Sequence, residues 1–351
     1  DLMGREPMPR IRRRRPRPAI RNQPRPPRSP LALAGPALVA FTVVVLTSCA
    51  SSSNVSAIGP SPALHEASYT SFDGDRLPYR KWLPKRGTPD LVVIGFHGIS
   101  GASLDLQNLG EHLQETHPGA AVYAPDLRGQ GNDPLLTRRG DIGQSDEWFR
   151  DARTFSRLVS RDHPGARIVW CGESMGSLIA LHATARAEAT PCDALILASP
   201  ITAIRDDLPA WRRQALRVGA FLCPGCRVSL EKLSGQDEVR VIRDVVHQDQ
   251  VQTNSYHLPD FTLRLLHTLG TLIEGMPGQA GHIPVPVLVL HGGKDIFSRP
   301  EDVESFVTRF PAEARVQRRF YPDSYHLLFY DHEHREVLAD IATWLRQLDR
   351  S

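Results

Sequence analysis

Residues 167–180, R-I-V-W-C-G-E-S-M-G-S-L-I-A, constrain the fold of this chain more than any other stretch. The apolar, β-prone residues 168–171 predict a buried strand, and residues 177–185 are typical of a helix. Between them, G-E-S-M-G fits the pattern G-x-S-x-G. A serine at a sharp strand-to-helix turn exposes its hydroxyl, and flanking glycines allow the backbone to turn so tightly. We therefore interpret Ser174 as a nucleophile rather than as part of an ordinary Gly-Ser turn.

Apolar strand patterns alternate with helical patterns along much of the chain. The expected strands are residues 91–96, 121–124, 168–171, 194–198, 285–290 and 316–321, and the expected helices include residues 104–115, 147–160 and 177–185. A hairpin, residues 67–72 and 77–83 around D-G-D, precedes them. Continuous apolar strands separated by helices are typical of a parallel sheet covered on both faces. The sequence therefore predicts an α/β fold with a mostly parallel sheet.

Residues 201–283 interrupt this alternation. They contain no convincing strand, and their apolar residues recur at helical spacing. An insertion of this length is too long for a structureless loop. We therefore expect a helical cap at residues 201–283, inserted into a core formed by residues 67–200 and 284–351, over the sheet edge where ligands bind in open α/β folds.

A serine hydroxyl needs a histidine to accept its proton and an acid to orient that histidine. With a nucleophile between strand and helix, the acid and then the histidine should follow at the ends of later strands. Asp295 follows one strand in H-G-G-K-D, and His326 follows the last strand in P-D-S-Y-H-L-L. These two residues are our candidates for the orienting acid and the base.

Several rivals for these two roles exist. The rival histidines are His291, just before Asp295, and His332 and His334, in the acidic stretch after the last strand. The rival acid is Asp323, which is too close in the sequence to His326 to approach its ring from another strand end.

The oxyanion of the reaction requires backbone N–H donors. One should be the N–H of Met175, directly after the nucleophile, and the other comes from the loop after an earlier strand. The strand at residues 91–96 leads into H-G-I-S-G, which makes the N–H of Ile99 the second candidate. His97 opens this turn, where a structural role, with its imidazole bonding local backbone, is favoured over a role as the base.

Five motifs occur together in a specific order: H-G-I-S-G, A-P-D-L-R-G-Q-G-N-D at residues 124–133, G-E-S-M-G, H-G-G-K-D and S-Y-H-L-L. Over about residues 67–348 the chain resembles the α/β-hydrolases of the monoacylglycerol lipase, lysophospholipase and serine aminopeptidase-like group. The resemblance implies the α/β-hydrolase fold, the roles given above, and a helical cap between strands 6 and 7. It implies a structural role for the loop with Asp126, Arg128 and Gly129. Glu173 and Ser177 depart from residues frequent in the group, histidine and glycine respectively.

Residues 1–48 have the composition of an export signal. They hold 10 of the 42 basic and 2 of the 39 acidic residues, so the rest of the chain has a net charge of 32 − 37 = −5. A basic, proline-rich part precedes 16 mostly apolar residues at 31–46, which are short for a transmembrane helix but suit a secretory signal peptide. The mildly acidic body argues against nucleic acid as a partner.

The sequence L-T-S-C at residues 46–49 ends this segment and resembles the lipobox of bacterial lipoproteins. The resemblance implies cleavage before Cys49 and lipid attachment to that residue, with a plain signal peptide or an uncleaved anchor as the alternatives. Ala50 after the cysteine favours the outer membrane, if the cell has one. Residues 49–66, rich in Ser, Gly and Pro, are then expected to form a flexible tether.

Among the remaining cysteines, Cys223 and Cys226 form C-P-G-C, which indicates either a structural disulfide or two idle thiols. Cys171 reads as a small buried apolar residue. No cofactor or metal site is indicated, because C-P-G-C lacks both the thioredoxin context and further metal ligands.

These observations predict a membrane-tethered serine hydrolase that cleaves carboxylic esters through an acyl-enzyme on Ser174. The family resemblance and the lipid anchor favour a lipid-like substrate such as a monoacylglycerol or lysophospholipid. A peptidase, a small-ester esterase and a non-catalytic ligand-binding lipoprotein are the alternatives. The oligomeric state is left open by the sequence.

Overall fold

The computed structural model describes residues 60–204, 210–230, 232, 239–247, 249–250 and 254–348. The predicted signal peptide and Cys49 lie outside these residues, as does most of the predicted tether.

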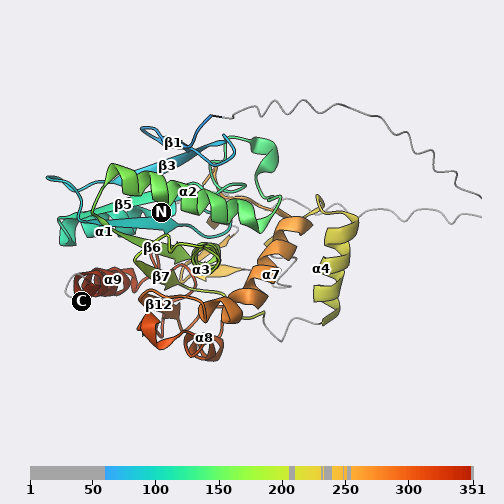
Figure 1. Cartoon of the computed structure of the whole chain (residues 1–351). Coiled ribbons are helices and arrows are strands. Elements are labelled where there is room, and N and C mark those ends of the chain that lie inside the picture. Colours follow the sequence, from blue (N-terminus) through green and yellow to red (C-terminus); the bar gives the residue numbers. More distant parts are fainter. Residues whose placement is uncertain are drawn as a thin grey trace, which may run out of the picture. The chain divides into compact units, whose positions relative to one another are not determined.

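A nine-stranded sheet forms the centre of the described residues (Figure 1). Its order across the sheet is β1 (Ala63–Leu64), β2 (Ser68–Thr70), β3 (Arg76–Trp82), β5 (Ala120–Pro125), β4 (Leu91–Phe96), β6 (Arg167–Glu173), β7 (Ala194–Ala198), β12 (Val287–Gly292) and β13 (Gln317–Tyr321). The six strands from β5 to β13 in this order are parallel to their neighbours, and the first three are antiparallel. The mostly parallel α/β sheet is therefore confirmed.

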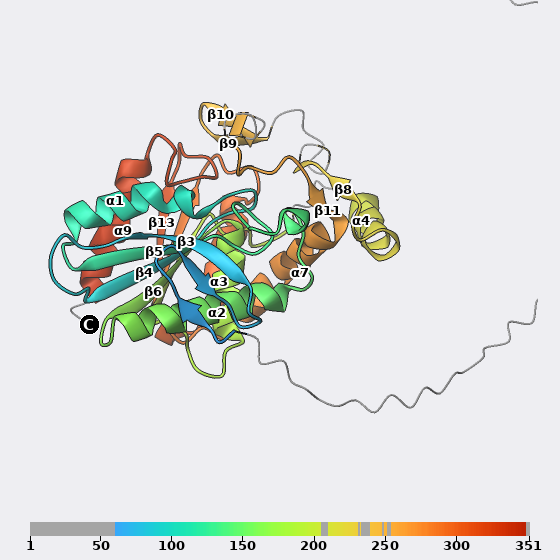
Figure 2. The same ribbon diagram turned by 90° about the horizontal axis from the view of Figure 1, so that it is seen from above.

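Helices cover both faces of the sheet. Side chains alternate between the two faces along each strand, so apolar strands present a hydrophobic surface on each face that helices bury. Val92, Ile94 and Phe96 of β4 belong to one hydrophobic core, while Leu91 and Val93 belong to another. The first core includes α2 (Ser145–Asp162), α3 (Met175–Ala185) and α8 (Pro300–Val307), and the second includes α1 (Gln107–Thr116) and α9 (His334–Leu348). Figure 2 shows α1 and α9 across the sheet from α2 and α3.

The segment between β7 and β12 differs in part from the expectation. It contains α4 (Ala210–Leu222) and α7 (Leu263–Ala280), which pack against each other, and α7 also packs on α3 (Figure 1). It also contains the strands β8 (Arg227–Val228), β9 (Arg240–Ile242), β10 (Val245–Val246) and β11 (Phe261–Thr262). The expectation of no strand here was wrong, because strands of two or three residues are too short to show an alternating pattern.

Two contacts hold this segment on the core. The side chain of Arg264 in α7 pairs with Asp141, and His182 in α3 lies 2.8 Å through Nε2 from the carbonyl oxygen of Leu272. The first contact ties α7 to the loop before α2 and the second fixes it beside α3, so the inserted segment has a defined place over the sheet edge.

Two smaller expectations are resolved. Cys223 and Cys226 form a disulfide, and Cys171 is a buried free thiol. The end of the predicted tether is ordered, because β1 pairs with β2 and the Tyr79 hydroxyl donates to the carbonyl oxygen of His65. That part of the expectation was wrong, since a Ser-, Gly- and Pro-rich composition does not reveal that two of its residues pair with the next strand.

No helix in the described ranges is both long and apolar enough to cross a membrane.

Candidate active site

Ser174 occupies a strained turn between β6 and α3. Its φ of +53° lies in the left-handed region, which non-glycine residues rarely adopt. A Cβ at Gly172 would lie 2.3 Å from the carbonyl oxygen of Gly176, and one at Gly176 would lie 1.9 Å from that of Phe96. Only glycine therefore fits at either flank. The turn presents Ser174 at the carboxyl end of β6, as the sequence pattern indicated.

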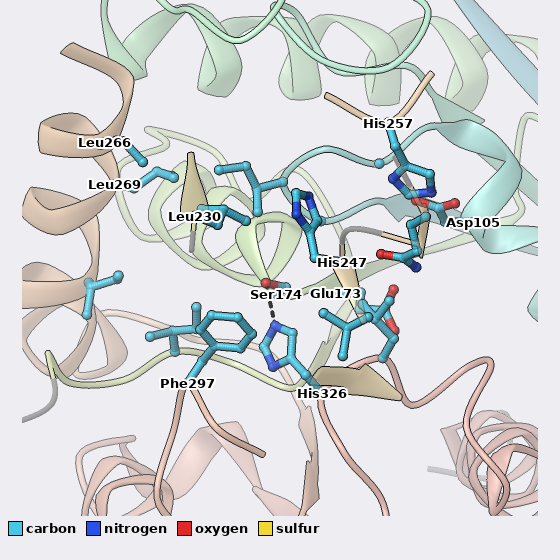
Figure 3. Close-up of a pocket in the computed structure, with 18 of the residues that line it drawn as sticks. Asp105, Glu173, Ser174, Leu230, His247, His257, Leu266, Leu269, Phe297 and His326 are labelled. Carbon is cyan, nitrogen blue, oxygen red and sulfur yellow. Dashed lines mark hydrogen bonds between the residues drawn. The ribbon is translucent and has the colours of Figure 1, made fainter. Parts of the chain in front are cut away.

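Ser174, His326 and Asp295 form one hydrogen-bonded chain. Nε2 of His326 lies 2.7 Å from Oγ of Ser174, and its Nδ1 lies 2.8 Å from Oδ2 of Asp295 (Figure 3). The other oxygen of Asp295 accepts the N–H of Phe297 at 2.8 Å, which fixes the carboxylate. All three predicted residues are buried. With the Nδ1 hydrogen directed at a carboxylate, Nε2 is left to accept the serine proton.

The rival residues lie elsewhere. His291 is buried with Nε2 3.2 Å from the carbonyl oxygen of Ser298, and it approaches Asp295 only to 4.0 Å. His332 and His334 contact Asp331 instead. Asp323 is exposed and forms an ion pair with Lys294 at 2.8 Å.

The elements that carry the predicted oxyanion donors border Ser174. Met175 is the first residue of α3, so its N–H has no carbonyl partner within the helix. A Cβ at Gly98 would lie 3.4 Å from the Cβ of Ser174, which places the turn with Ile99 directly beside the nucleophile. Ile99 and Ser174 line the same pocket.

His97 supports that turn and does not reach the nucleophile. Its Nε2 accepts the N–H of Leu127 at 3.0 Å, so its Nδ1 donates to the carbonyl oxygen of Gly98 at 2.8 Å. Burial lowers the pKa of His97, which keeps the ring neutral. Asp126 in the neighbouring loop accepts two hydrogen bonds from Ser103. Both residues therefore hold backbone in place.

Ser174 lies in a pocket of about 430 Å³ with two different sides. One side is apolar and is formed by Leu230, Leu266, Leu269, Ile273 and Phe297. The other is polar and includes Asp105, Glu173, Tyr256, His257 and Tyr330. Figure 3 shows Leu266 and Leu269 on the opposite side of Ser174 from Glu173 and Asp105. The pocket can therefore accept an amphiphilic molecule with its junction near the serine.

The acidic side of the pocket was not predicted. Burial, followed by the charge of Asp105, raises the pKa of Glu173 to about 8. Burial also raises the pKa of Asp105 to about 7. The sequence singled out Glu173 only as a departure from the family pattern, and it held no signal for Asp105, which lies in the 3-10 helix Ser103–Leu106. Nowhere in the described ranges do three or more His, Cys, Asp or Glu side chains form a group that could hold a metal ion.

Known proteins resemble this chain over most of its length. A monoacylglycerol lipase of Mycolicibacterium smegmatis is 28% identical over 282 residues, covering 80% of this chain and 96% of that protein. A monoglyceride lipase of Rattus norvegicus is 24% identical, covering 78% and 88%. The crystal structure of a monoacylglycerol lipase of Paleococcus ferrophilus superposes with a TM-score of 0.63 at 23% identity, covering 77% of this chain and 98% of that one.

A soluble variant of monoglyceride lipase from Saccharomyces cerevisiae, solved with a substrate analogue, superposes with a TM-score of 0.67 at 18% identity and covers 82% and 98% of the two chains. At these identities the solved structures establish the fold alone. The model of the family described as serine aminopeptidase, S33, matches residues 87–333. The chain therefore belongs to the serine aminopeptidase (S33) family of hydrolases and has the α/β-hydrolase fold.

Proposed function

We propose that this protein is a serine hydrolase that cleaves carboxylic esters of single-chain lipids through an acyl-enzyme on Ser174. The observation that carries the proposal is the hydrogen-bonded chain from Ser174 through His326 to Asp295, at 2.7 and 2.8 Å, beside a pocket with an apolar side. The names of the curated relatives, monoacylglycerol and monoglyceride lipase, agree with this chemistry.

The geometry supports a two-step reaction. Oγ of Ser174 attacks the ester carbonyl while Nε2 of His326 accepts its proton, and the N–H groups of Met175 and Ile99 stabilise the oxyanion. His326 then donates this proton to the departing alcohol. A water molecule deprotonated by His326 then attacks the acyl carbonyl, and His326 returns that proton to Oγ of Ser174 as the fatty acid leaves. Throughout, Asp295 keeps the imidazole in one tautomer and stabilises its positive charge.

The apolar side of the pocket supports an acyl chain as the group bound there. Leu266, Leu269 and Ile273 lie on α7 at helical spacing, so one face of that helix supplies a continuous apolar surface. A monoacylglycerol or a lysophospholipid carries one such chain. A small ester or a peptide, the substrates of the alternative esterase and peptidase, would leave much of this apolar surface uncovered.

We further propose export of the protein and attachment to a membrane through lipidated Cys49, with the outer membrane favoured in a cell that has one. The support is the L-T-S-C sequence after an apolar segment and the Ser-, Gly- and Pro-rich stretch that follows it. Mass spectrometry of the mature N-terminus, with Cys49→Ala as the comparison, tests this. An N-terminal residue other than a lipid-modified Cys49 would contradict it.

The activity is tested with a fluorophosphonate probe and a series of p-nitrophenyl esters of increasing acyl length. We expect the probe to label the native protein but not Ser174→Ala, and we expect octanoate to be hydrolysed faster than acetate. Monoacylglycerols and lysophospholipids are then compared directly. A folded native protein that neither reacts with the probe nor hydrolyses any ester would refute the proposal and favour a ligand-binding lipoprotein.

A further inference from the structure

Most buried carboxylates in the described residues have a cationic or imidazole partner. Asp151 lies 2.7 Å from Nε of Arg128, Asp133 lies 2.8 Å from Nε of Arg138, and Asp295 contacts His326. This is the expected pattern, because a buried charge without a partner is costly.

Glu173 and Asp105 depart from this pattern. Glu173 is only 1% exposed, and its Oε1 has no hydrogen-bond partner among the described residues. Asp105 accepts the N–H of Ala102 at 3.0 Å and a hydrogen bond from Tyr256, and neither group is charged. Both side chains line the pocket with Ser174 (Figure 3). The acid pair therefore faces the space that a substrate occupies.

The remaining charges at the pocket do not compensate this pair. Arg213, on α4, is the one Lys or Arg among the described lining residues, and α4 packs on α7, the helix of the apolar side. Burial lowers the pKa of His257, on the acidic side, to about 4, so that its ring is neutral. The rings of Tyr256 and Tyr330 complete this side. Carboxylates beside aromatic rings are the groups that bind organic ammonium ions.

We propose that Glu173 and Asp105 select the alcohol half of the substrate by charge, favouring an alcohol with an ammonium group and disfavouring one with a phosphate. This inference rests on the proposed ester hydrolysis and adds a head-group preference to it. A bound ammonium would supply the positive partner that the acid pair lacks, whereas a phosphate would add a negative charge to two carboxylates. Of the two lipid classes considered above, this favours uncharged monoacylglycerols over lysophospholipids with an anionic head group.

The raised pKa values make the preference dependent on pH. Ammonium ions interact with the ionised acids, and the pKa values of about 7 and about 8 place ionisation between pH 6 and 9. The preference should therefore be weak at pH 6 and strong at pH 9. Asp126, His247, His257, Tyr256 and Tyr330 also lie near this pair. Burial raises the pKa of both tyrosines and lowers that of His257 to about 4, so these three groups titrate outside this interval.

The test compares octanoylcholine with 3,3-dimethylbutyl octanoate, an ester of the same shape without the charge. Both esters would be cleaved by the same Ser174, His326 and Asp295, so the ratio of their kcat/KM values isolates the effect of charge. We expect the full-length native protein to favour octanoylcholine about tenfold or more at pH 8.5, because its trimethylammonium group is attracted to the ionised carboxylates and to the neighbouring aromatic rings. The ratio should approach 1 at pH 6.

Two variants and one control locate the effect. Glu173→Gln and Asp105→Asn keep the side-chain shape and should each reduce the ratio several-fold while hydrolysis of the uncharged ester continues. Glu304→Gln removes a charge from the exposed face of α8 and should leave the ratio unchanged. Monooctanoylglycerol should likewise exceed its phosphorylated counterpart, 1-octanoyl glycerol 3-phosphate, in kcat/KM.

A ratio near 1 in the native protein at pH 8.5 would overturn the inference, and so would a ratio that both variants leave unchanged. In either case continued hydrolysis of 3,3-dimethylbutyl octanoate would leave the proposed function intact. Failure to hydrolyse any of the four esters would instead refute the proposed function.

Discussion

Replacing Asp295 with Asn should nearly abolish turnover without unfolding the protein. In the proposed acylation step His326 becomes positively charged, and its Nδ1 lies 2.8 Å from Oδ2 of Asp295. The side chains of His326 and Asp295 are only 4% and 0% exposed, so bulk water screens this attraction little. For charge centres about 4 Å apart at an effective dielectric constant of about 20, the attraction is roughly 4 kcal/mol. A loss of that size in the transition state corresponds to about a 10³-fold lower kcat.

An amide at this position also disturbs the tautomer, because it can direct its NH₂ group at Nδ1 of His326. We therefore expect a decrease of about 10³- to 10⁴-fold for Asp295→Asn. The assay is the initial rate of p-nitrophenyl octanoate hydrolysis at pH 8, with thermal unfolding recorded for the same samples.

The matched control is Asp323→Asn, which removes the rival acid. Asp323 lies on the surface in an ion pair with Lys294, so this change should alter kcat by less than about twofold. Retention of more than a tenth of the native rate by Asp295→Asn, or an equal loss in Asp323→Asn, would refute the assignment of Asp295 as the orienting acid.

Three further predictions concern stability. Gly176→Ala should lower the unfolding free energy by at least about 2 kcal/mol in urea titrations, because its Cβ would lie 1.9 Å from the Phe96 carbonyl oxygen; unchanged stability would contradict this. Burial lowers the pKa of His182 from 6.5 to about 4, so the unfolding free energy should fall by up to about 3 kcal/mol as the pH drops from 6.5 to 4. The fall should be smaller in His182→Gln, and equal losses in the two proteins would exclude His182 as its source. Replacing both Cys223 and Cys226 with Ser should lower the unfolding free energy by about 2 kcal/mol, as expected for a disulfide that closes a four-residue loop. Mass spectrometry of the alkylated native protein should show no free thiol at these two positions.

Local pattern was sufficient for much of the core. Strands β4 and β7 have the predicted bounds, because fully buried parallel strands are continuous apolar runs. The turn at Ser174 was predictable because glycines flank it at the spacing that a tight strand-to-helix turn requires. Chain order alone then favoured Asp295 and His326 over nearer or equally polar rivals.

Pairing between strands decided what local pattern missed. β1 forms because residues 63–64 pair with β2, and a Ser-, Gly- and Pro-rich composition does not reveal such a partner. The short strands β8 and β11 pair with each other across more than thirty residues, so neither has a local signature. For β8 and β11 the stabilising hydrogen bonds come from residues distant in the sequence.

The sequence by itself determined the chemistry of this protein, and the tertiary structure decided the environment of that chemistry. The order of Ser174, Asp295 and His326 follows from strand ends that meet at one edge of a parallel sheet, a rule that operates along the chain. The proximity of Glu173 to Asp105 and the apolar face of α7 opposite them exist only in the folded chain. Burial and contact between distant residues set those charges and that shape, and neither is encoded in any local run of residues.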